Sequence, residues 1–380
     1  MKKITQILKK ELMLTASVLA AAAAMLITPP TAELLKGIDW HTLATLFMML
    51  TVLEGFKKEN IFWPVLRFAG RIGTMSGLTL FLVFGVFFSS MFVTNDVSLI
   101  VFVPLTIILF RAGNREHYIL PVITMENIAA VRGSLLMPFG SPQNLFIFGQ
   151  SGVSAGRFIA YMFPIWIMSG ILLVVFIFLL YRKNPGEKTG IGDLEGGGDI
   201  DGARRKRQIL YLCLFAMIIW TIVSRTSLWP AAVVIVAAAV FAADRKLLFS
   251  TDYVLLLTFL CFFVFSSSIA ANPGISAFLK DSVAGREYLW SILLSQLISN
   301  VPASIVLYPF ADNVGALLYG LDSAGLCSLI GSLASVINYR IYVREYPGKG
   351  MAFIRTFTLV SLAFFAIVVI PGYLISRAPL

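Results

Sequence analysis

The chain has 380 residues, of which 58% are hydrophobic and only 13% are charged. A soluble domain carries about 25% charged residues because its surface faces water, so this composition excludes an ordinary soluble protein and predicts a polytopic membrane protein. The net charge of +10 does not indicate nucleic-acid binding, because the basic residues lie at the ends of apolar segments, where they orient a membrane protein.

The first apolar segment, 12–28, follows Lys2, Lys3, Lys9 and Lys10. The basic side of a span is cytoplasmic, so we expect a cytoplasmic N-terminus and a first span that runs outward. A basic start before an apolar run also resembles a signal peptide, and cleavage is the alternative. Further spans follow at once, which favours a retained helix.

A second span is expected over 39–56, and Lys57 and Lys58 return the chain to the cytoplasm. Segment 61–71 mixes aromatic and basic residues. This pattern predicts an amphipathic helix that lies in the membrane interface.

The next apolar region, about 73–110, is too long for one span and is interrupted by Thr94, Asn95 and Asp96. Because arginines flank both of its ends, both ends should be cytoplasmic. The region therefore predicts a re-entrant hairpin with a polar tip.

A discontinuous helix is expected over about 117–150, with its break around 138–142. Non-helical backbone at membrane depth survives only where protein or a cavity satisfies its polar groups. A full span over 158–181 then returns to the cytoplasm.

Residues 183–207 are rich in glycine and charge and have almost no apolar content. We expect a flexible cytoplasmic linker there. It divides the chain into a first half, 1–182, and a second half, 208–380.

The second half is expected to repeat the order of the first. Its hairpin is interrupted by Ser299, Asn300 and Pro302, and its broken helix by Gly331 and Ser332. The expected elements are spans at 208–223, 228–243 and 252–270, an interfacial piece at about 274–285, a hairpin at about 287–311, a broken helix at about 314–343 and a last span at about 353–375.

The two halves are expected to be inverted repeats within an all-α membrane fold. Charge places Asp39, which opens the second span, outside, and Asp252, which opens its counterpart, inside. Paired interruptions at corresponding positions of two halves point to a transporter's binding site near the midplane. A duplication retained only for packing is the alternative, and the polarity of the interruptions argues against it.

The candidate binding residues all lie at these interruptions. Backbone carbonyls and short side-chain oxygens suit Na⁺, and the N-termini of half-helices favour an anion. The candidates are Thr94, Asn95, Asp96, Gly140, Ser141, Pro142, Gln143, Asn144, Ser299, Asn300, Val301, Pro302, Gly331, Ser332 and Ser335.

Three charged residues are expected at membrane depth: Asp96, Glu126 and Arg132. Asp96 should bind a cation, carry a proton or pair, because an unpaired carboxylate is costly in hydrocarbon; capping the second arm of the hairpin is the alternative role. Arg132 could bind a substrate carboxylate in bidentate geometry. Equally, Arg132 and Glu126 could form a mutual or interfacial charge pair.

Four motifs together resemble those of the ion transporter superfamily, which contains citrate and dicarboxylate permeases, divalent-anion/sodium symporters, arsenite permeases and some Na⁺/H⁺ antiporters. The segment 90–99 with 103–105 resembles the first hairpin of that superfamily, and 298–303 resembles the second. Segments 138–145 and 329–335 resemble its two helix breaks.

The resemblance implies a homodimer with a scaffold domain and a transport domain. The transport domain would comprise both hairpins and both broken helices and would move across the membrane in the elevator manner. The resemblance also implies one cation site made by Asn95 with 140–144 and another made by Asn300 with 331–335, with the substrate between them.

The sequence departs from the superfamily pattern at both tips, where Asp96 and Val301 stand in place of the usual Thr. Ser141 stands where Asn is expected, and Val131-Arg132 where an Asn-Leu pair is expected. We interpret Arg132 as a local change in substrate selectivity.

The leading expectation is transport of a small anion, a di- or tricarboxylate, across the plasma membrane, with Na⁺ or H⁺ as coupling ion and no other cofactor. Na⁺/H⁺ antiport through Asp96 and an arsenite or other oxyanion permease are the alternatives. An enzyme would need a constellation such as His-Glu-x-x-His or Gly-x-Ser-x-Gly, and neither occurs. Two asymmetric polar half-sites favour a carrier over a channel. The expected partners are the anion, the cation, the lipid bilayer and a second copy of the chain. We also expect the C-terminus of the chain to be external.

Overall fold

The computed structural model is built from helices in its described part, which confirms the all-α class expected from the sequence. Seven of the described helices are long and apolar enough to cross a membrane. The structure describes residues 12–28, 38–61, 68–69, 72–190, 202–224, 226–378 and 380.

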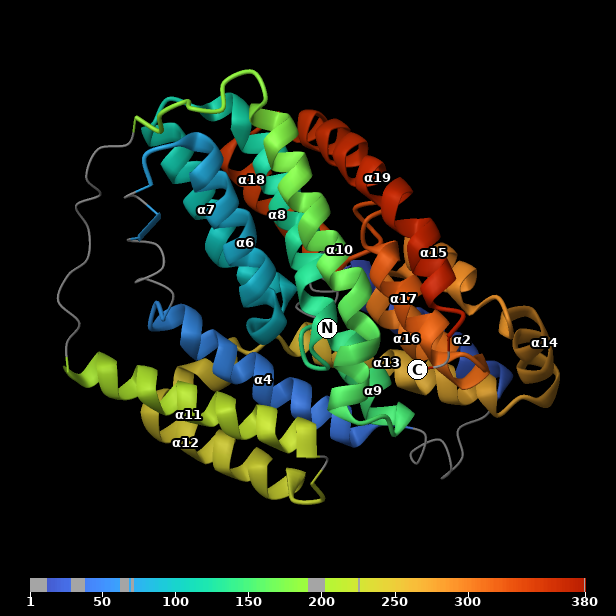
Figure 1. The fold of residues 1–380 in the computed structure, drawn as a ribbon. Coiled ribbons are helices and arrows are strands. Elements are labelled where there is room, and N and C mark those ends of the chain that lie inside the picture. The colour runs from blue at the N-terminus through green and yellow to red at the C-terminus, as the bar shows by residue number, and fades with distance from the viewer. Residues whose placement is uncertain are drawn as a thin grey trace.

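One group of helices, which we call the lower layer, crosses the bottom of the view in Figure 1. It contains Leu12–Ile27 (α2), Trp40–Lys58 (α4), Gly202–Ser224 (α11), Trp229–Ser250 (α12) and Tyr253–Ala270 (α13). In this layer α4, α11 and α12 pack against one another, α13 packs against α4, and α2 packs against α13.

The hairpins and the broken helices form a second group, which we call the upper bundle (Figure 1). From the first half it contains Met75–Val93 (α6), Asn95–Ala112 (α7), Ile119–Gly133 (α8), Pro142–Ser151 (α9) and Ala155–Tyr181 (α10). From the second half it contains Glu287–Ile298 (α15), Asn300–Leu307 (α16), Val314–Ala324 (α17), Leu333–Glu345 (α18) and Gly350–Ile375 (α19). The bundle meets the lower layer where α9 contacts α4 and α16 contacts α13.

Short elements connect these helices. Three 3-10 turns lie at Glu116–Tyr118, Ser134–Leu136 and Tyr308–Phe310. Pro273–Val283 (α14) precedes the second hairpin, where the sequence predicts an interfacial piece. Its expected counterpart in the first half, 61–71, lies mostly outside the described residues.

Corresponding helices of the two halves begin in the same way. The carboxylate of Asp39 accepts a hydrogen bond from Thr42 N, and that of Asp252 accepts one from Leu255 N, both at 2.9 Å. Aspartate is a favoured N-cap because it satisfies a free N–H of the first turn. Each of these two helices packs against the helix that precedes the other. Helix α2 precedes α4 in the chain but packs against α13, and α12 precedes α13 but packs against α4.

The bases of the two hairpins lie near opposite ends of α10. The first begins beside the end of α10, where the hydroxyls of Thr79 and Tyr181 lie 2.8 Å apart. The second begins at Glu287, whose carboxylate accepts N–H bonds from the loop before α17. There α17 contacts the start of α10, since a Cβ on Gly315 would lie 2.2 Å from Tyr161 Oη. Because α10 has 27 residues and is therefore about 40 Å long, the two hairpin bases are well separated.

The hairpins differ in length. The arms α6 and α7 have 19 and 18 residues, whereas α15 and α16 have 12 and 8. Each arm of the first hairpin is long enough to cross a membrane, and its re-entrant course stays a prediction.

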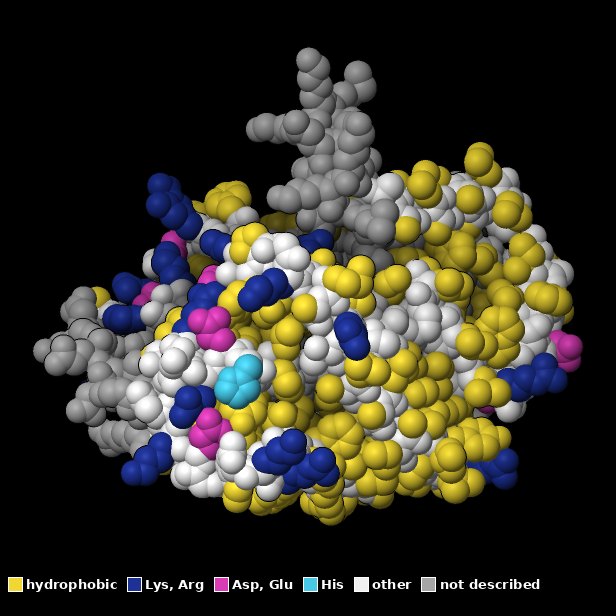
Figure 2. Space-filling view, turned by 90° about the horizontal axis from the view of Figure 1, so that it is seen from above, with side chains coloured by type: hydrophobic (Ala, Val, Ile, Leu, Met, Phe, Trp, Pro, Cys, Tyr) yellow, Lys and Arg dark blue, Asp and Glu magenta, His cyan; other side chains and the backbone are white. Residues whose placement is uncertain are grey.

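Ion pairs mark the end of the bundle at which α7, α10 and α18 terminate. Arg111 Nη1 lies 2.8 Å from Glu345 Oε2, and Arg115 Nε lies 2.7 Å from Glu187 Oε1. Viewed from above in Figure 2, charged side chains gather on the left of this face and hydrophobic ones cover the right. Basic residues at one end of the spans support the predicted cytoplasmic side.

Part of the segment predicted as a linker is packed. Residues before 191 join the start of α6, where Met75 N donates to Glu187 O at 2.8 Å and Thr189 N donates to Gly73 O at 3.0 Å. At the other end of the segment, α11 begins at Gly202. Residues 191–201 lie outside the described residues.

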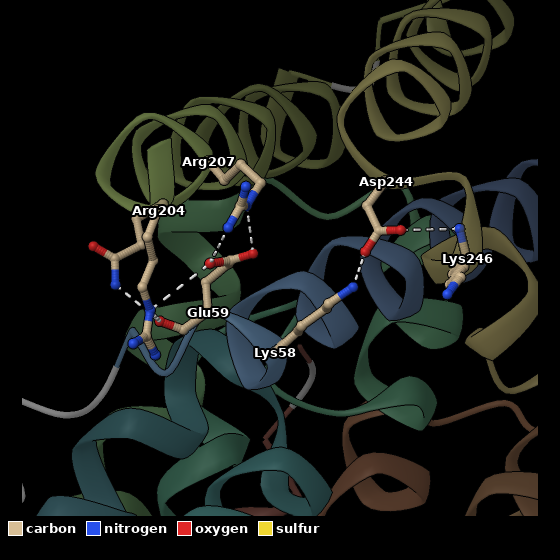
Figure 3. A network of polar contacts seen from close by, with 7 residues as sticks. Lys58, Glu59, Arg204, Arg207, Asp244 and Lys246 are labelled. Carbon is tan, nitrogen blue, oxygen red and sulfur yellow. Dashed lines mark hydrogen bonds and ion pairs between the residues drawn. The ribbon is translucent and has the colours of Figure 1, made fainter. Parts of the chain in front are cut away.

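A polar network ties the end of α4 to α11 and α12 (Figure 3). Glu59 is 3% exposed, and its carboxylate lies 2.7 Å from Arg207 Nε and 3.8 Å from Arg204 Nε. Next to it, Lys58 pairs with Asp244. The sequence predicts that the span of α12 ends at 243, but the helix continues to Ser250 through a kink at Asp244.

Candidate functional site

The tip of the first hairpin is a single non-helical residue, Thr94, between α6 and α7. Its torsions, φ 70° and ψ 156°, fall in a region that is essentially restricted to glycine and is associated with functional sites. Thr94 and Asn95 are buried. Asn95 Oδ1 accepts a hydrogen bond from Asp96 N at 2.9 Å, so the tip folds back on its own backbone.

Asp96 lies in the first turn of α7, and Thr94 occupies the N-cap position. The alternative role predicted for Asp96, that of the N-cap, is therefore wrong. The carboxylate of Asp96 has one oxygen, Oδ1, without a hydrogen-bond partner among the described residues.

The tip of the second hairpin repeats this geometry. Ser299 has φ 70° and ψ 157°, and Ser299, Asn300, Val301 and Pro302 are buried. Asn300 N donates to Gly331 O at 3.1 Å, and Asn300 Nδ2 donates to Leu321 O at 3.4 Å. The structure thus brings Asn300 and Gly331 together, two residues that the sequence assigns to one site.

The first helix break contains Gly140 and Ser141. A Cβ on Gly140 would lie 2.0 Å from Ser134 O, so the chain can fold over the end of α8 only with glycine there. Ser141 is extended, and α9 follows with Pro142, Gln143 and Asn144 buried in its first turn. The ring contact between Phe92 and Phe139, 6.5 Å between centroids, links this break to the first hairpin.

The second break follows the same plan. A Cβ on Gly331 would lie 2.3 Å from Ala324 O. Ser332 has φ −146° and ψ 138°, close to the φ −147° and ψ 154° of Ser141. In the first turn of α18, Ser335 Oγ accepts a hydrogen bond from Asn127 Nδ2 at 3.0 Å.

The two half-sites form one region because each break packs against the other half. Helix α9 contacts α16 and α17, and α18 contacts α7 and α8. At the centre, a Cβ on Gly325 would lie 3.1 Å from Val131 Cγ1. The candidate residues of the sequence analysis lie on the two hairpin tips, in the two breaks and in the first turns of α7, α9, α16 and α18.

Four helices begin in this region, and some N–H groups of their first turns are already bonded, since Asp96 N donates to Asn95 Oδ1 and Asn300 N donates to Gly331 O. Within the described chain, no side chain accepts a hydrogen bond at the N-cap position of α7, α9, α16 or α18. The N-cap positions of α8, α12, α15 and α19 also lack a side-chain acceptor, whereas side chains cap α4, α6, α10, α13, α14 and α17. The first N–H groups of a helix attract anions through their free donors and the helix dipole, so the helices that begin at the tips and breaks can offer such donors.

Many buried side-chain atoms of this region are also unsatisfied. Buried polar groups are normally hydrogen-bonded, so a cluster of exceptions indicates room for a ligand, an ion or water. Counting only the described residues, the atoms here without a hydrogen-bond partner are Asp96 Oδ1, Glu126 Oε2, Asn127 Oδ1, Arg132 Nη2, Ser141 Oγ, Gln143 Oε1, Asn144 Oδ1, Ser299 Oγ and Asp322 Oδ2.

Arg132 and Glu126 do not form a pair. Glu126 accepts a hydrogen bond from Thr106. Arg132 Nε donates to Ser169 Oγ at 3.0 Å, and its charge is attracted by Asp322. The interpretation of Arg132 and Glu126 as a mutual charge pair is therefore wrong.

Asp322 is a buried charged residue of this region that sequence reasoning missed. It is 2% exposed, and its Oδ1 accepts a hydrogen bond from Gln143 Nε2 at 3.2 Å. In the structure Asp322 stands two residues before Ala324, as Arg132 stands two residues before Ser134, and the carbonyls of Ala324 and Ser134 meet the break glycines. Matching the sequence from the two Gly-Ser pairs would align Arg132 with Ser323 instead, so the only signal in the sequence was a single charge in an apolar helix.

A pocket lies between α9 and the lower layer. Near it, Gln150 of α9 donates a hydrogen bond to Asp39 Oδ2 at 2.8 Å. On the side of the upper bundle, the pocket is lined by residues of α9. Its lining residues are His41, Thr42, Thr45, Leu145, Phe148, Gly149, Ile222, Thr226, Ser227 and Trp229.

The sequence profile of the family described as "Citrate transporter" matches residues 4–331. The chain belongs to the citrate transporter family. The match includes both hairpins and the first break and ends at Gly331 of the second. It confirms the resemblance to the ion transporter superfamily, and with the apolar helices it supports a multi-pass membrane protein.

Two relatives of known sequence are similar over most of their length. The chain is 33% identical over 315 residues to "Inner membrane protein YbiR" of Escherichia coli, which covers 80% of each protein. It is 29% identical over 314 residues to "Uncharacterized transporter MJ0456" of Methanocaldococcus jannaschii, which covers 81% of this chain and 83% of that protein. Membership in this family makes the chain a transporter.

Proposed function

We propose that the protein is a secondary active transporter that moves a small anion, a di- or tricarboxylate, together with Na⁺ or H⁺. The observation that carries this proposal is that four helices without a side-chain N-cap pack together across the two halves, α9 against α16 and α7 against α18. Such termini bind carboxylates without a dedicated cationic side chain for each oxygen. Two pairs of termini, one from each half, suit an anion with more than one carboxylate.

Asn95 and Asn300 are the proposed centres of two cation sites. Each follows a tip residue with positive φ, and each lies in the first turn of a helix. Short side-chain oxygens and free carbonyls at helix breaks are typical Na⁺ ligands in transporters. The oxygens of Ser141 and Asn144 that lack a hydrogen-bond partner among the described residues support the first site.

Alternating access is proposed to occur by movement of the upper bundle against the lower layer, in the elevator manner. The hairpins and breaks belong to the bundle, and their contacts with the lower layer run through α9 and α16. The lower layer would then be the scaffold and would form the homodimer contact.

Uptake of labelled citrate and of a labelled dicarboxylate into proteoliposomes tests the proposal. An imposed Na⁺ or H⁺ gradient should drive uptake in the wild type, and the double variant Asn95→Ala plus Asn300→Ala should lose it. No carboxylate uptake under either gradient, with intact Na⁺-driven proton movement, would establish antiport instead. Uptake of arsenite in place of carboxylates would establish an oxyanion permease.

A further inference from the structure

Arg132 and Asp322 are opposite charges at corresponding positions of the two halves. Arg132 lies in the last turn of α8 and Asp322 in the last turn of α17, and they are 1% and 2% exposed. Each stands two residues before the carbonyl that its own break glycine contacts. The breaks thus bring a guanidinium and a carboxylate into the same buried region.

Arg132 and Asp322 interact through one long hydrogen bond to the backbone and through the attraction of their side-chain charges. Arg132 Nη1 donates to the backbone oxygen of Asp322 at 3.4 Å, and the opposite side-chain charges attract. In the part of the chain that the structure describes, the side chains share no direct hydrogen bond, and Arg132 Nη2 and Asp322 Oδ2 have no partner. One donor and one acceptor therefore remain available in a buried, charged region.

The surroundings leave Asp322 as the counter-ion of Arg132. The other groups that act on the guanidinium are the phenols of Tyr288 and Tyr319, which are ordinarily neutral. Tyr288 and Tyr319 donate their hydroxyl protons to the carbonyls of Val369 and Tyr161, at 2.9 and 2.6 Å. They add no charge to the region.

We propose that Asp322 substitutes for the substrate carboxylate in the empty carrier. When substrate is bound, one of its carboxylates neutralises Arg132 at Nη2. When the site is empty, the carboxylate of Asp322 neutralises Arg132, so the bundle crosses the membrane without an uncompensated buried charge. The inference rests on the proposed function and identifies a residue needed for the return step.

If Asp322 is needed only in the empty carrier, its loss should affect net uptake of substrate but not exchange of substrate. Exchange of internal for external substrate uses only the loaded carrier, whereas net uptake requires the empty carrier to return. Breaking a buried ion pair by removing one partner is strongly unfavourable because it leaves an uncompensated charge. Asp322→Asn should therefore keep exchange and lose net uptake by about 100-fold.

The test measures exchange and net uptake of a labelled carboxylate in proteoliposomes for the wild type, Asp322→Asn and Asp322→Glu. The Glu variant should recover net uptake because it restores the charge. Glu59→Gln is the matched control: Glu59 is also buried but lies at the end of α4 in the lower layer, where it pairs with Arg207, so the ratio of net uptake to exchange should stay at the wild-type value. Equal loss of both modes in Asp322→Asn, or a wild-type ratio, would overturn the inference.

A second measurement tests the charge pair without transport. Thermal unfolding in detergent should show that the double variant, Arg132→Gln plus Asp322→Asn, is destabilised less than the sum of the two single variants. The reason is that each single change leaves one buried charge without its partner. Additive effects would show that the charges do not compensate each other. If the wild type neither exchanges nor accumulates any carboxylate, the proposed function fails, which is a different outcome from either of these.

Discussion

Gly140 and Gly331 occupy positions at which a side chain has no room. In both cases the close neighbour is a backbone carbonyl, of Ser134 and of Ala324, and a carbonyl cannot turn aside as a flexible side chain can. The shape of each half-site therefore depends on one residue that contributes no side-chain atom.

We expect Gly140→Ala and Gly331→Ala to reduce transport by at least about 10-fold, because relieving the overlap must shift the backbone of the break by strain on the order of 1–3 kcal/mol. Initial uptake rates in proteoliposomes measure the effect. Gly156→Ala is the control, since nothing lies within 4 Å of a Cβ there. Wild-type rates in both break variants would show that the breaks do not shape the site.

At the same scale, the sequence predicts the identity of the break and tip residues but not their partners. Gly-Ser pairs and polar residues inside apolar segments can be recognised in the sequence alone. By contrast, Arg132 meets Asp322 and Asn127 meets Ser335 only because the halves fold together. Asp322 has no local signal beyond a single charge in an apolar helix.

At the scale of elements, charge and apolar length predict most helix ends, and α11 is the instructive exception. Residues 202–207 are polar and basic and read as linker, but Arg204 and Arg207 continue the helix by pairing with Glu59 at the end of α4. That support comes from a residue far away in the sequence. A local pattern therefore places the start of α11 too late.

Glu59→Gln should lower the free energy of unfolding by about 1–3 kcal/mol, because charge-assisted hydrogen bonds are lost from a carboxylate that is almost fully buried. Thermal unfolding in detergent measures the change. Asp244→Asn is the matched comparison, since its pair with Lys58 is more exposed, and exposed pairs contribute only about 0–1 kcal/mol. Equal shifts for the two variants would contradict the structural role of Glu59.

At the scale of the whole molecule, the contact between Gln150 of α9 and Asp39 of α4 joins the upper bundle to the lower layer. A cross-link there should stop transport if the bundle moves. We expect Asp39→Cys plus Gln150→Cys, joined by a short bifunctional thiol reagent, to lose uptake, while each single variant keeps it under the same reagent.

The control for this cross-link joins two helices of the bundle itself. Arg111→Cys plus Glu345→Cys connects α7 to α18, whose side chains lie 2.8 Å apart, and should leave uptake intact. Uptake that survives the first cross-link would rule out movement between the two groups of helices.

The orientation of the chain gives a further prediction. The start of α17 and the end of α19 meet where Asn313 Nδ2 donates to Ser376 O at 3.0 Å, at the other end of the bundle from the Arg111–Glu345 pair. We expect the C-terminus to be external. Alkaline phosphatase fused after Leu380 should be active, and a fluorescent protein that folds only in the cytoplasm should stay dark; the reverse pattern would contradict the assigned sides.

The paired hairpin tips have a consequence for the ancestry of the chain. Thr94 and Ser299 share a backbone torsion that L-residues rarely adopt, although the arms around them now differ in length. We infer that both hairpins descend from one. If the hairpins enter from opposite sides, as the charge pattern predicts, the ancestral polypeptide would have had to insert in either direction and pair with an oppositely facing copy of itself. Fusion would then have made that pairing permanent and allowed the two copies to acquire opposite charges, Arg132 in one and Asp322 in the other.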